Sequence, residues 1–131
     1  MMVLDTSALM ALLLSEPESD EIAEVLSGEE PFVISAGTLS EALIVAKRRG
    51  VRDELAELLD AIGVEVEVLD AAKAVAVADA YAKWGKGAHA AGLNFGDCFA
   101  YVAAKANNLP LLYIGDDFAK TDVLSARAGS A

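Results

Sequence analysis

The chain has 131 residues, of which 55% are hydrophobic, and it carries a formal net charge of −11. This length fits one domain with a sizeable core, and the acidic balance, taken alone, argues against a nucleic-acid binder because phosphate contacts need Lys and Arg. No apolar run approaches the ~18 residues of a membrane-spanning helix, and Asp5 interrupts the first apolar run before a signal peptide could form. The single cysteine, Cys98, excludes an internal disulfide and fits a reducing compartment, so we expect a cytoplasmic protein.

The first half of the chain predicts two strands and four helices from its apolar spacing and turn residues. In chain order these are a strand at 2–5, helices at 6–14 and 18–26, a strand at 32–35, and helices at 37–49 and 53–62. Lys47, Arg48 and Arg49 occupy the last turn of the helix at 37–49, where positive charge complements the helix dipole.

The second half begins with a stretch at 64–68 that alternates apolar and acidic residues, which predicts a strand near an edge of the sheet. A helix at 71–84, a helix at 94–107 and a buried strand at 109–114 follow, and the tail to Ala131 is small and polar. The glycine-rich stretch at 85–92 is the best candidate for a mobile loop. Strands that alternate with helices predict an α/β domain over residues 1–131, with a mostly parallel sheet covered by helices on both faces.

Several acidic residues stand where predicted strands end or predicted helices begin, and each has a structural explanation of its own because helix starts attract acids. Asp5 fits an N-cap, Glu41 completes a capping box that begins at Thr38, and Asp97 lies in the first turn after a capping Asn94. Asp116 and Asp117 fit a turn. Other acids lie on solvated helix faces and account for much of the negative charge.

Taken together, these acids predict more than a set of caps, because the carboxyl ends of parallel strands meet at one edge of a sheet. Carboxylates that crowd together raise one another's pKa, so such a cluster needs a cation. Oxygen ligands without a set of His or Cys favour Mg²⁺ or Mn²⁺ over zinc. His89, the only histidine, fits either a plain loop residue or a phosphate contact, and Cys98 fits a packed side chain.

Four stretches match a known family in order and spacing: Val3–Ala8, Ser35–Glu41, Leu93–Tyr101, and Leu111–Phe118 with Thr121-Asp122. The stretches Asn94-Phe95-Gly96-Asp97 and Gly115-Asp116-Asp117-Phe118 are the most specific. Together they resemble the PIN-domain ribonucleases and, within that family, the VapC-type toxins of bacterial toxin–antitoxin pairs. The resemblance implies one PIN-like domain with a parallel sheet of four or five strands flanked by helices.

The resemblance also implies an active site. Its catalytic acids are Asp5, Glu41, Asp97 and Asp116. Asp5, Asp97 and Asp116 are expected to bind metal, Glu41 to ligate or hold a metal-bound water, and Asp117 is the alternative to Asp116. The expected supporting residues are Thr6, Ser7, Asp117 and Asp122. Lys83, Lys86 and His89 are candidates for RNA backbone contacts, although both lysines fit solvated helix ends equally well.

The activity implied by the resemblance is metal-dependent hydrolysis of RNA, with transfer or ribosomal RNA as the expected substrate, which inhibits translation until an antitoxin neutralises the toxin. Two ions roughly 3.5–4 Å apart would activate water and stabilise the leaving 3′-oxygen, and their charge would offset the acidity of the protein. A VapB-type antitoxin is expected to bind the apolar sides of segments 18–27 and 51–62 and to place an Arg in the acidic pocket. A homodimer is also expected.

Two other function classes stay open at this point. A structure-specific DNA nuclease shares the fold, but the short chain has no helical arch or added DNA-binding module. A non-catalytic PIN-like binding module commonly lacks one or more of the acids, whereas all of them are present here.

Overall fold

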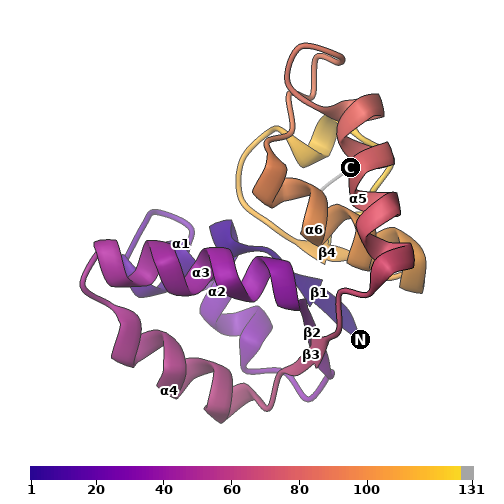
Figure 1. Cartoon of the computed structure of the whole chain (residues 1–131). Helices are drawn as coiled ribbons and strands as arrows, with labels where there is room; N and C mark the ends of the chain where they lie inside the picture. Colours follow the sequence, from indigo (N-terminus) through magenta and orange to yellow (C-terminus); the bar gives the residue numbers. More distant parts are fainter. Residues whose placement is uncertain (128–131) are drawn as a thin grey trace.

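A four-stranded parallel sheet with helices on both faces organises the computed structural model, which describes residues 1–127 (Figure 1). The strands are β1 (Met2–Leu4), β2 (Phe32–Ser35), β3 (Glu65–Glu67) and β4 (Leu111–Leu112). The helices are α1 (Thr6–Leu13), α2 (Ser19–Leu26), α3 (Ala36–Arg48), α4 (Arg52–Ile62), α5 (Ala71–Trp84) and α6 (Phe95–Asn107), and a 3₁₀ turn follows at Phe118–Lys120. The strand order β3-β2-β1-β4 confirms the predicted sheet and the edge position of β3.

The strands β1, β2 and β4 are buried and mostly apolar because both faces of the sheet are covered there, whereas the edge strand β3 is largely exposed. Successive side chains of a strand point to opposite faces. Val3, Val33 and Leu111 therefore join one hydrophobic cluster with α5 and α6. Leu4 and Ile34 join the opposite cluster, which α1 to α4 complete. Within residues 1–127 we find no helix whose length and apolar character would let it cross a membrane.

The start of α3 differs from the sequence-based expectation. Ser35 caps this helix, and its Oγ accepts a hydrogen bond of 3.2 Å from the backbone N–H of Gly37. Thr38 and Glu41 therefore lie inside the helix, and the expected capping box between them is wrong. The helix starts earlier because the chain turns directly after β2, which leaves Thr38 fully buried and frees Glu41 for another role.

Residues 123–127 run along the outer side of β4. The backbone N–H of Leu111 donates to the Leu124 carbonyl at 2.8 Å, and the N–H of Ala126 donates to the Leu111 carbonyl at 2.9 Å. Arg127 then makes two hydrogen bonds, of 3.0 and 2.8 Å, to the Glu21 carboxylate on α2. These contacts cover a sheet edge that would otherwise present unpaired backbone groups. The last part of the expected polar tail, 128–131, lies outside the described residues.

The expected loop at 85–92 is tied to the end of α5 by backbone hydrogen bonds. The N–H groups of Ala88 and His89 donate to the Gly85 carbonyl at 3.0 and 3.1 Å. The Nδ1 atom of His89 accepts from the Ala91 N–H at 2.9 Å, and its ring packs edge-on against Trp84 with 4.7 Å between ring centroids. His89 thus has a structural role in shaping this loop.

Candidate functional site

An acidic pocket of about 260 Å³ opens at the carboxyl edge of the sheet, beside β1 and β4. It is lined by Asp5, Ser7, Asn94, Asp97, Ile114, Gly115, Asp116, Asp117 and Phe118. Asp5 follows β1, Asp97 lies in the first turn of α6, and Asp116 and Asp117 lie in the turn after β4. Open α/β sheets bind their ligands at this edge, so the topology alone makes the pocket a candidate site.

Asp5 is the most deeply buried acid in the pocket, with 3% of its surface exposed. Its Oδ2 atom accepts hydrogen bonds from Ser7, from the backbone N at 3.0 Å and from Oγ at 2.6 Å. Within residues 1–127 its Oδ1 atom is buried without a hydrogen-bond partner. Burial raises the pKa of Asp5 to about 7, against the lowering effect of the Ser7 hydrogen bonds and with added repulsion from Asp97 and Glu41. A buried oxygen in these surroundings suits a bound cation.

Ser7 connects the carboxyl ends of the neighbouring strands β1 and β4. Its Oγ atom donates to Asp5 and accepts a 3.0 Å hydrogen bond from the backbone N–H of Ile114, which follows β4. Thr6 has a different role, because its hydroxyl donates to the carbonyl of Thr38 at 3.5 Å in the contact between α1 and α3. Of the two hydroxyls expected near the site, only that of Ser7 contacts an acid of the pocket within the described part of the chain.

Asp97 combines a capping role with a place in the pocket. The Oδ1 atom of Asn94 accepts from the Asp97 N–H at 2.8 Å, and Oδ2 of Asp97 accepts from the Asn94 N–H at 3.0 Å. Burial raises the pKa of Asp97, the hydrogen bond from Asn94 opposes this, and the charges of Glu41 and Asp117 add to the increase. The capping box therefore fixes Asp97 where other carboxylates surround it.

Glu41 reaches this group from α3, which packs against α6. Its charge helps to raise the pKa of both Asp5 and Asp97. A Cβ atom at Gly96 would overlap the Glu41 carboxylate, so this helix position accommodates Glu41 only because it lacks a side chain. Sequence reasoning noticed the Asn-Phe-Gly-Asp stretch but missed this role of its glycine, because the contact joins residues from two helices.

Asp116 and Asp117 both line the acidic pocket and are both exposed. Asp117 is near enough to raise the pKa of Asp97 by its charge, whereas no such effect of Asp116 is found. Within residues 1–127 no three Asp, Glu, His or Cys side chains lie close enough together to hold one ion as they are arranged. The acids thus share a pocket and an electrostatic field, and the two exposed members have the freedom of surface side chains to approach a ligand.

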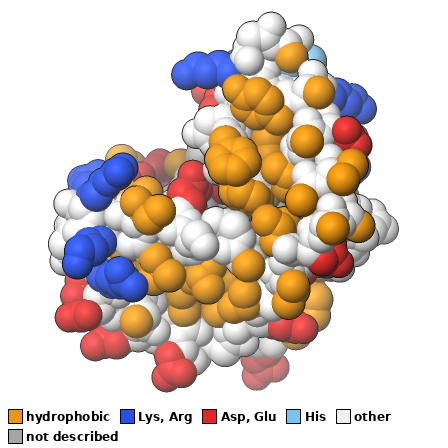
Figure 2. Space-filling view, viewed as in Figure 1, with side chains coloured by type: hydrophobic (Ala, Val, Ile, Leu, Met, Phe, Trp, Pro, Cys, Tyr) orange, Lys and Arg blue, Asp and Glu red, His pale blue; other side chains and the backbone are white. Residues whose placement is uncertain are grey.

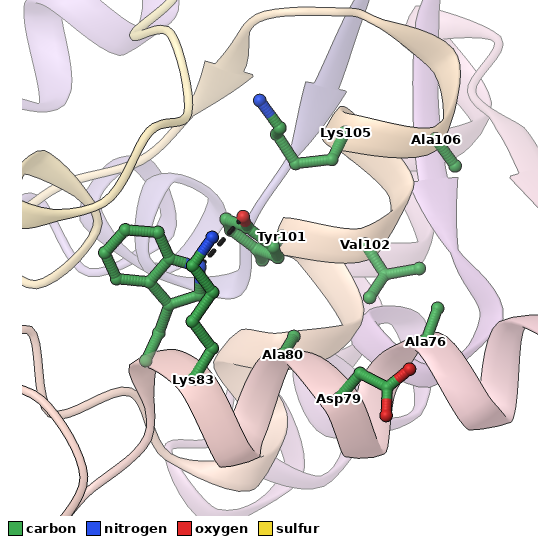
Figure 3. A pocket seen from close by; sticks show the side chains of 9 residues that line it. Ala76, Asp79, Ala80, Lys83, Tyr101, Val102, Lys105 and Ala106 are labelled. Carbon is green, nitrogen blue, oxygen red and sulfur yellow. Dashed lines mark hydrogen bonds between the residues drawn. The ribbon is translucent and has the colours of Figure 1, made fainter.

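Four other residues from the sequence-based site lie away from the acidic pocket. Asp122 accepts a 2.6 Å hydrogen bond from the Tyr101 hydroxyl and forms a 3.3 Å ion pair with Lys105. Lys83 lies 4.9 Å from the centre of the Trp84 ring, in a separate groove of about 400 Å³ between α5 and α6 (Figure 3). Lys86 and His89 are exposed on the neighbouring loop, and neither lines the pocket.

The sequence of the chain matches the PIN domain family over residues 2–124. It is 40% identical to ribonuclease VapC36 of Mycobacterium tuberculosis over 126 residues, which cover 93% of this chain and 91% of that protein. It is 41% identical to ribonuclease VapC of Mycolicibacterium smegmatis over 126 residues, which cover 93% of this chain and 97% of that protein.

Solved structures resemble the fold over nearly the whole chain. Mycobacterium tuberculosis VapC20, described as a Sarcin-Ricin loop cleaving toxin, superimposes with a TM-score of 0.80 at 16% identity, covering 97% of this chain and 99% of that one. A toxin–antitoxin complex from Klebsiella pneumoniae superimposes with a TM-score of 0.70 at 19% identity, covering 93% of each chain. At such low sequence identity these structures support only the fold, whereas the ribonuclease relatives at 40–41% identity show the family.

Proposed function

The chain belongs to the PIN-domain family, in its VapC ribonuclease group, and from this membership we propose that the acidic pocket hydrolyses RNA phosphodiester bonds with divalent cations. The chain is a toxin endoribonuclease of a toxin–antitoxin pair. Its curated relatives are named ribonucleases, which favours this function over a DNA nuclease or a non-catalytic binding module.

The observation that carries the metal-dependent part of this proposal is the Oδ1 atom of Asp5, which is buried without a partner beside other carboxylates. A cation would offset the repulsion that raises the pKa of Asp5 and Asp97. Asp5, Asp97 and one acid of the turn after β4 would hold it, and Glu41 would contribute directly or through water. Oxygen ligands favour Mg²⁺ or Mn²⁺, with two ions during catalysis.

The identity of the acid after β4 is a separate part of the proposal. The sequence-based prediction puts Asp116 nearest the cation, with Asp117 as the alternative, whereas the charge of Asp117 is the one that raises the pKa of Asp97. We favour Asp117 on this electrostatic ground. If Asp117→Asn loses RNA cleavage and Asp116→Asn retains it, Asp117 is the ligand. The reverse result would assign this role to Asp116.

The protein's own contribution to the chemistry is to hold the carboxylates in place. A divalent cation, when bound, supplies positive charge to the phosphodiester and acidifies water for attack. Ser7 fixes the Asp5 carboxylate through Oδ2 and leaves Oδ1 without a donor. Asn94 orients Asp97 through the capping box, and the missing side chain at Gly96 gives Glu41 its position. Groups fixed in this way need little reorganisation when the substrate binds.

The partners follow from the family. Two structural neighbours are toxin–antitoxin structures, which supports a VapB-type antitoxin as a partner of this chain. An antitoxin Arg in the acidic pocket would pair with its carboxylates and replace the cation, with the antitoxin lying along the α2 and α4 regions. A second copy of the chain could bind an exposed apolar surface beside β3 and α5. This surface is formed by Val66 on β3, Val68 just after it, and Val75 on α5. Apolar side chains follow α5 in Figure 2.

The proposed substrate is RNA of the translation machinery, either transfer or ribosomal RNA, encountered in the cytoplasm. One structural neighbour is described as a toxin that cleaves the sarcin–ricin loop, which supports a looped RNA. The test is to incubate the protein, purified without antitoxin, with total RNA and Mg²⁺ or Mn²⁺. Cleavage is expected with the wild type and Asp60→Asn, an exposed charge-matched control, and at least ~100-fold less with Asp5→Asn. Equal cleavage by Asp5→Asn would reject the proposal.

A further inference from the structure

Four of the ten Lys and Arg residues of this acidic chain stand within six positions: Lys47, Arg48, Arg49 and Arg52. We call them the basic cluster. All four are exposed, and within residues 1–127 none of them forms an ion pair. Basic side chains gather where α3 turns into α4 in Figure 2, although Asp53 and Glu54 follow directly on α4. Unpaired cations concentrated in this way attract anions locally despite the net charge of −11.

The basic cluster is connected to the acidic pocket through one face of α3. Glu41 and Arg48 are two helical turns apart, which places them on the same side of the helix at a separation of roughly 10 Å along its axis. Both line a cavity of about 590 Å³ between α3 and α6. Glu41 also belongs electrostatically to the acidic group, since it raises the pKa of Asp5 and Asp97. Neighbouring residues at the start of α6 line the two hollows, Phe95 and Gly96 the cavity and Asn94 and Asp97 the acidic pocket, so the cavity lies beside the proposed site of cleavage.

The cavity wall is apolar and aromatic. Phe95 is 66% exposed, two residues before Asp97, and its ring lies 4.8 Å from that of Phe99 in an edge-on arrangement. A Cβ atom at Gly37 would overlap the Phe99 ring, so the close approach of α3 to α6 depends on a glycine. The volume suits a small planar group. Exposed aromatic rings beside a basic surface are typical of binding to unstacked nucleic-acid bases.

We propose that the RNA strand passes from the acidic pocket along α3, with one unstacked base in the cavity against Phe95 and its phosphates at the basic cluster. This inference rests on the proposed ribonuclease function and adds a path and a substrate feature to it. An unpaired base is available in a loop or single strand but not within a duplex. The path therefore predicts a preference for unpaired RNA next to the cleaved bond.

The test measures binding instead of cleavage. Asp5→Asn protein, whose cleavage should be strongly reduced, is titrated with a fluorescent single-stranded RNA at several salt concentrations, so that the RNA stays largely intact. Each lost phosphate contact should reduce the slope of log affinity against log salt by about 0.7. Arg48→Gln and the pair Arg49→Gln/Arg52→Gln should therefore lower both affinity and slope, and Arg48→Lys should retain the slope. Lys73→Gln, a charge-matched change at the start of α5, should leave the slope unchanged.

The base subsite is tested by Phe95→Ala, with Leu124→Ala as an equally exposed apolar control. Loss of a stacking contact should weaken RNA binding roughly 5- to 100-fold without changing the salt slope. Unchanged binding by the Phe95 and Arg48 variants would overturn the proposal. Two other results for these variants would also overturn it. If they dissociate a dimer but keep their RNA affinity, this face binds a second copy of the chain. If they lose only thermal stability, the residues have only a structural role. If wild-type protein binds RNA by this path but leaves it uncleaved, the ribonuclease function is rejected instead.

Discussion

Two carboxylate environments in the molecule, those of Asp122 and Asp5, differ in how many hydrogen-bond and ion-pair partners the chain provides. Asp122 accepts a 2.6 Å hydrogen bond from Tyr101 and pairs with Lys105 at 3.3 Å. Desolvation opposes ionisation of Asp122, but these partners hold its pKa below the usual range. Asp5 has Ser7 as its hydrogen-bond partner and an Oδ1 atom without any, and burial raises its pKa to about 7.

Asp122 therefore stabilises the fold, whereas ionised Asp5 destabilises it in the absence of a ligand. The Tyr101 hydroxyl completes the first environment, since it also accepts a 2.9 Å hydrogen bond from the Trp84 indole. Burial raises the pKa of Tyr101 to about 12, so this hydroxyl stays protonated as a donor. Among the described residues no Lys or Arg pairs with an acid of the acidic pocket, and the Ser7 hydroxyl contacts only Oδ2 of Asp5, so the charge of the pocket is left for a ligand to neutralise.

The largest expected effect is the pH dependence of the metal-free protein. The pKa of Asp5 is about 7 in the folded state against an ordinary value of 3.8. Between these values the folded state binds a proton that the unfolded state does not, so the contribution of Asp5 to stability falls as pH rises. The full loss is on the order of 4 kcal/mol. Urea unfolding in a chelator at several pH values measures it.

Asp5→Asn provides the control for this measurement, because other carboxylates also titrate. The stability difference between wild type and Asp5→Asn should widen in favour of the variant as pH rises from 3.8 to about 7, and Mg²⁺ should reduce this difference. The charge of Asp122 should act in the opposite direction, with its stabilising effect lost as pH falls. If the stability difference between wild type and Asp5→Asn does not change with pH, the environment of Asp5 does not differ from that of Asp122 in the way described.

A smaller effect is expected from Gly96→Ala, which perturbs only the acidic environment. The new Cβ atom would displace the Glu41 carboxylate, so RNA cleavage should fall roughly 10- to 100-fold. Stability should change by less than about 1 kcal/mol, because Ala favours a helix more than Gly does. If the effect acts through Glu41, adding Glu41→Gln should cost little more. Additive losses of cleavage would contradict this explanation.

The smallest effect is expected from Tyr101→Phe, which perturbs only the satisfied environment. Removal of the hydroxyl leaves the Trp84 N–H without its acceptor and Asp122 without its donor, which should cost about 1–2 kcal/mol of stability in urea unfolding. Mn²⁺ affinity and RNA cleavage should stay close to wild type. Tyr81→Phe, on the exposed side of α5, should change neither. Loss of metal binding in Tyr101→Phe would show that the two environments are coupled.

The sequence predicts the fold well because the signals are local. Val3, Val33 and Leu111 belong to short apolar runs bounded by turn residues, and each run forms a strand of the sheet. Helix starts are harder to predict where two residues can cap. Both Ser35 and Thr38 fit an N-cap, and only the packing of Thr38 in the core selects Ser35.

The acidic site is predicted only in part, because its details depend on contacts between distant segments. The end of β1 places Asp5, and the start of α6 places Asp97, in one pocket at the carboxyl edge of the sheet. No local pattern indicates that Gly96 makes room for Glu41. The partners of Asp122 could not be predicted from the sequence either. The structure pairs Asp122 with Tyr101 and Lys105, away from the acidic pocket where a supporting role was expected.

The most direct test of the central claim is a calorimetric titration of the purified chain with Mn²⁺. Wild-type protein should bind the ion, and Asp5→Asn should bind it at least ~10-fold more weakly, while Asp122→Asn retains the wild-type affinity. Absence of Mn²⁺ binding by folded wild-type protein, or equal binding by Asp5→Asn, would contradict the account.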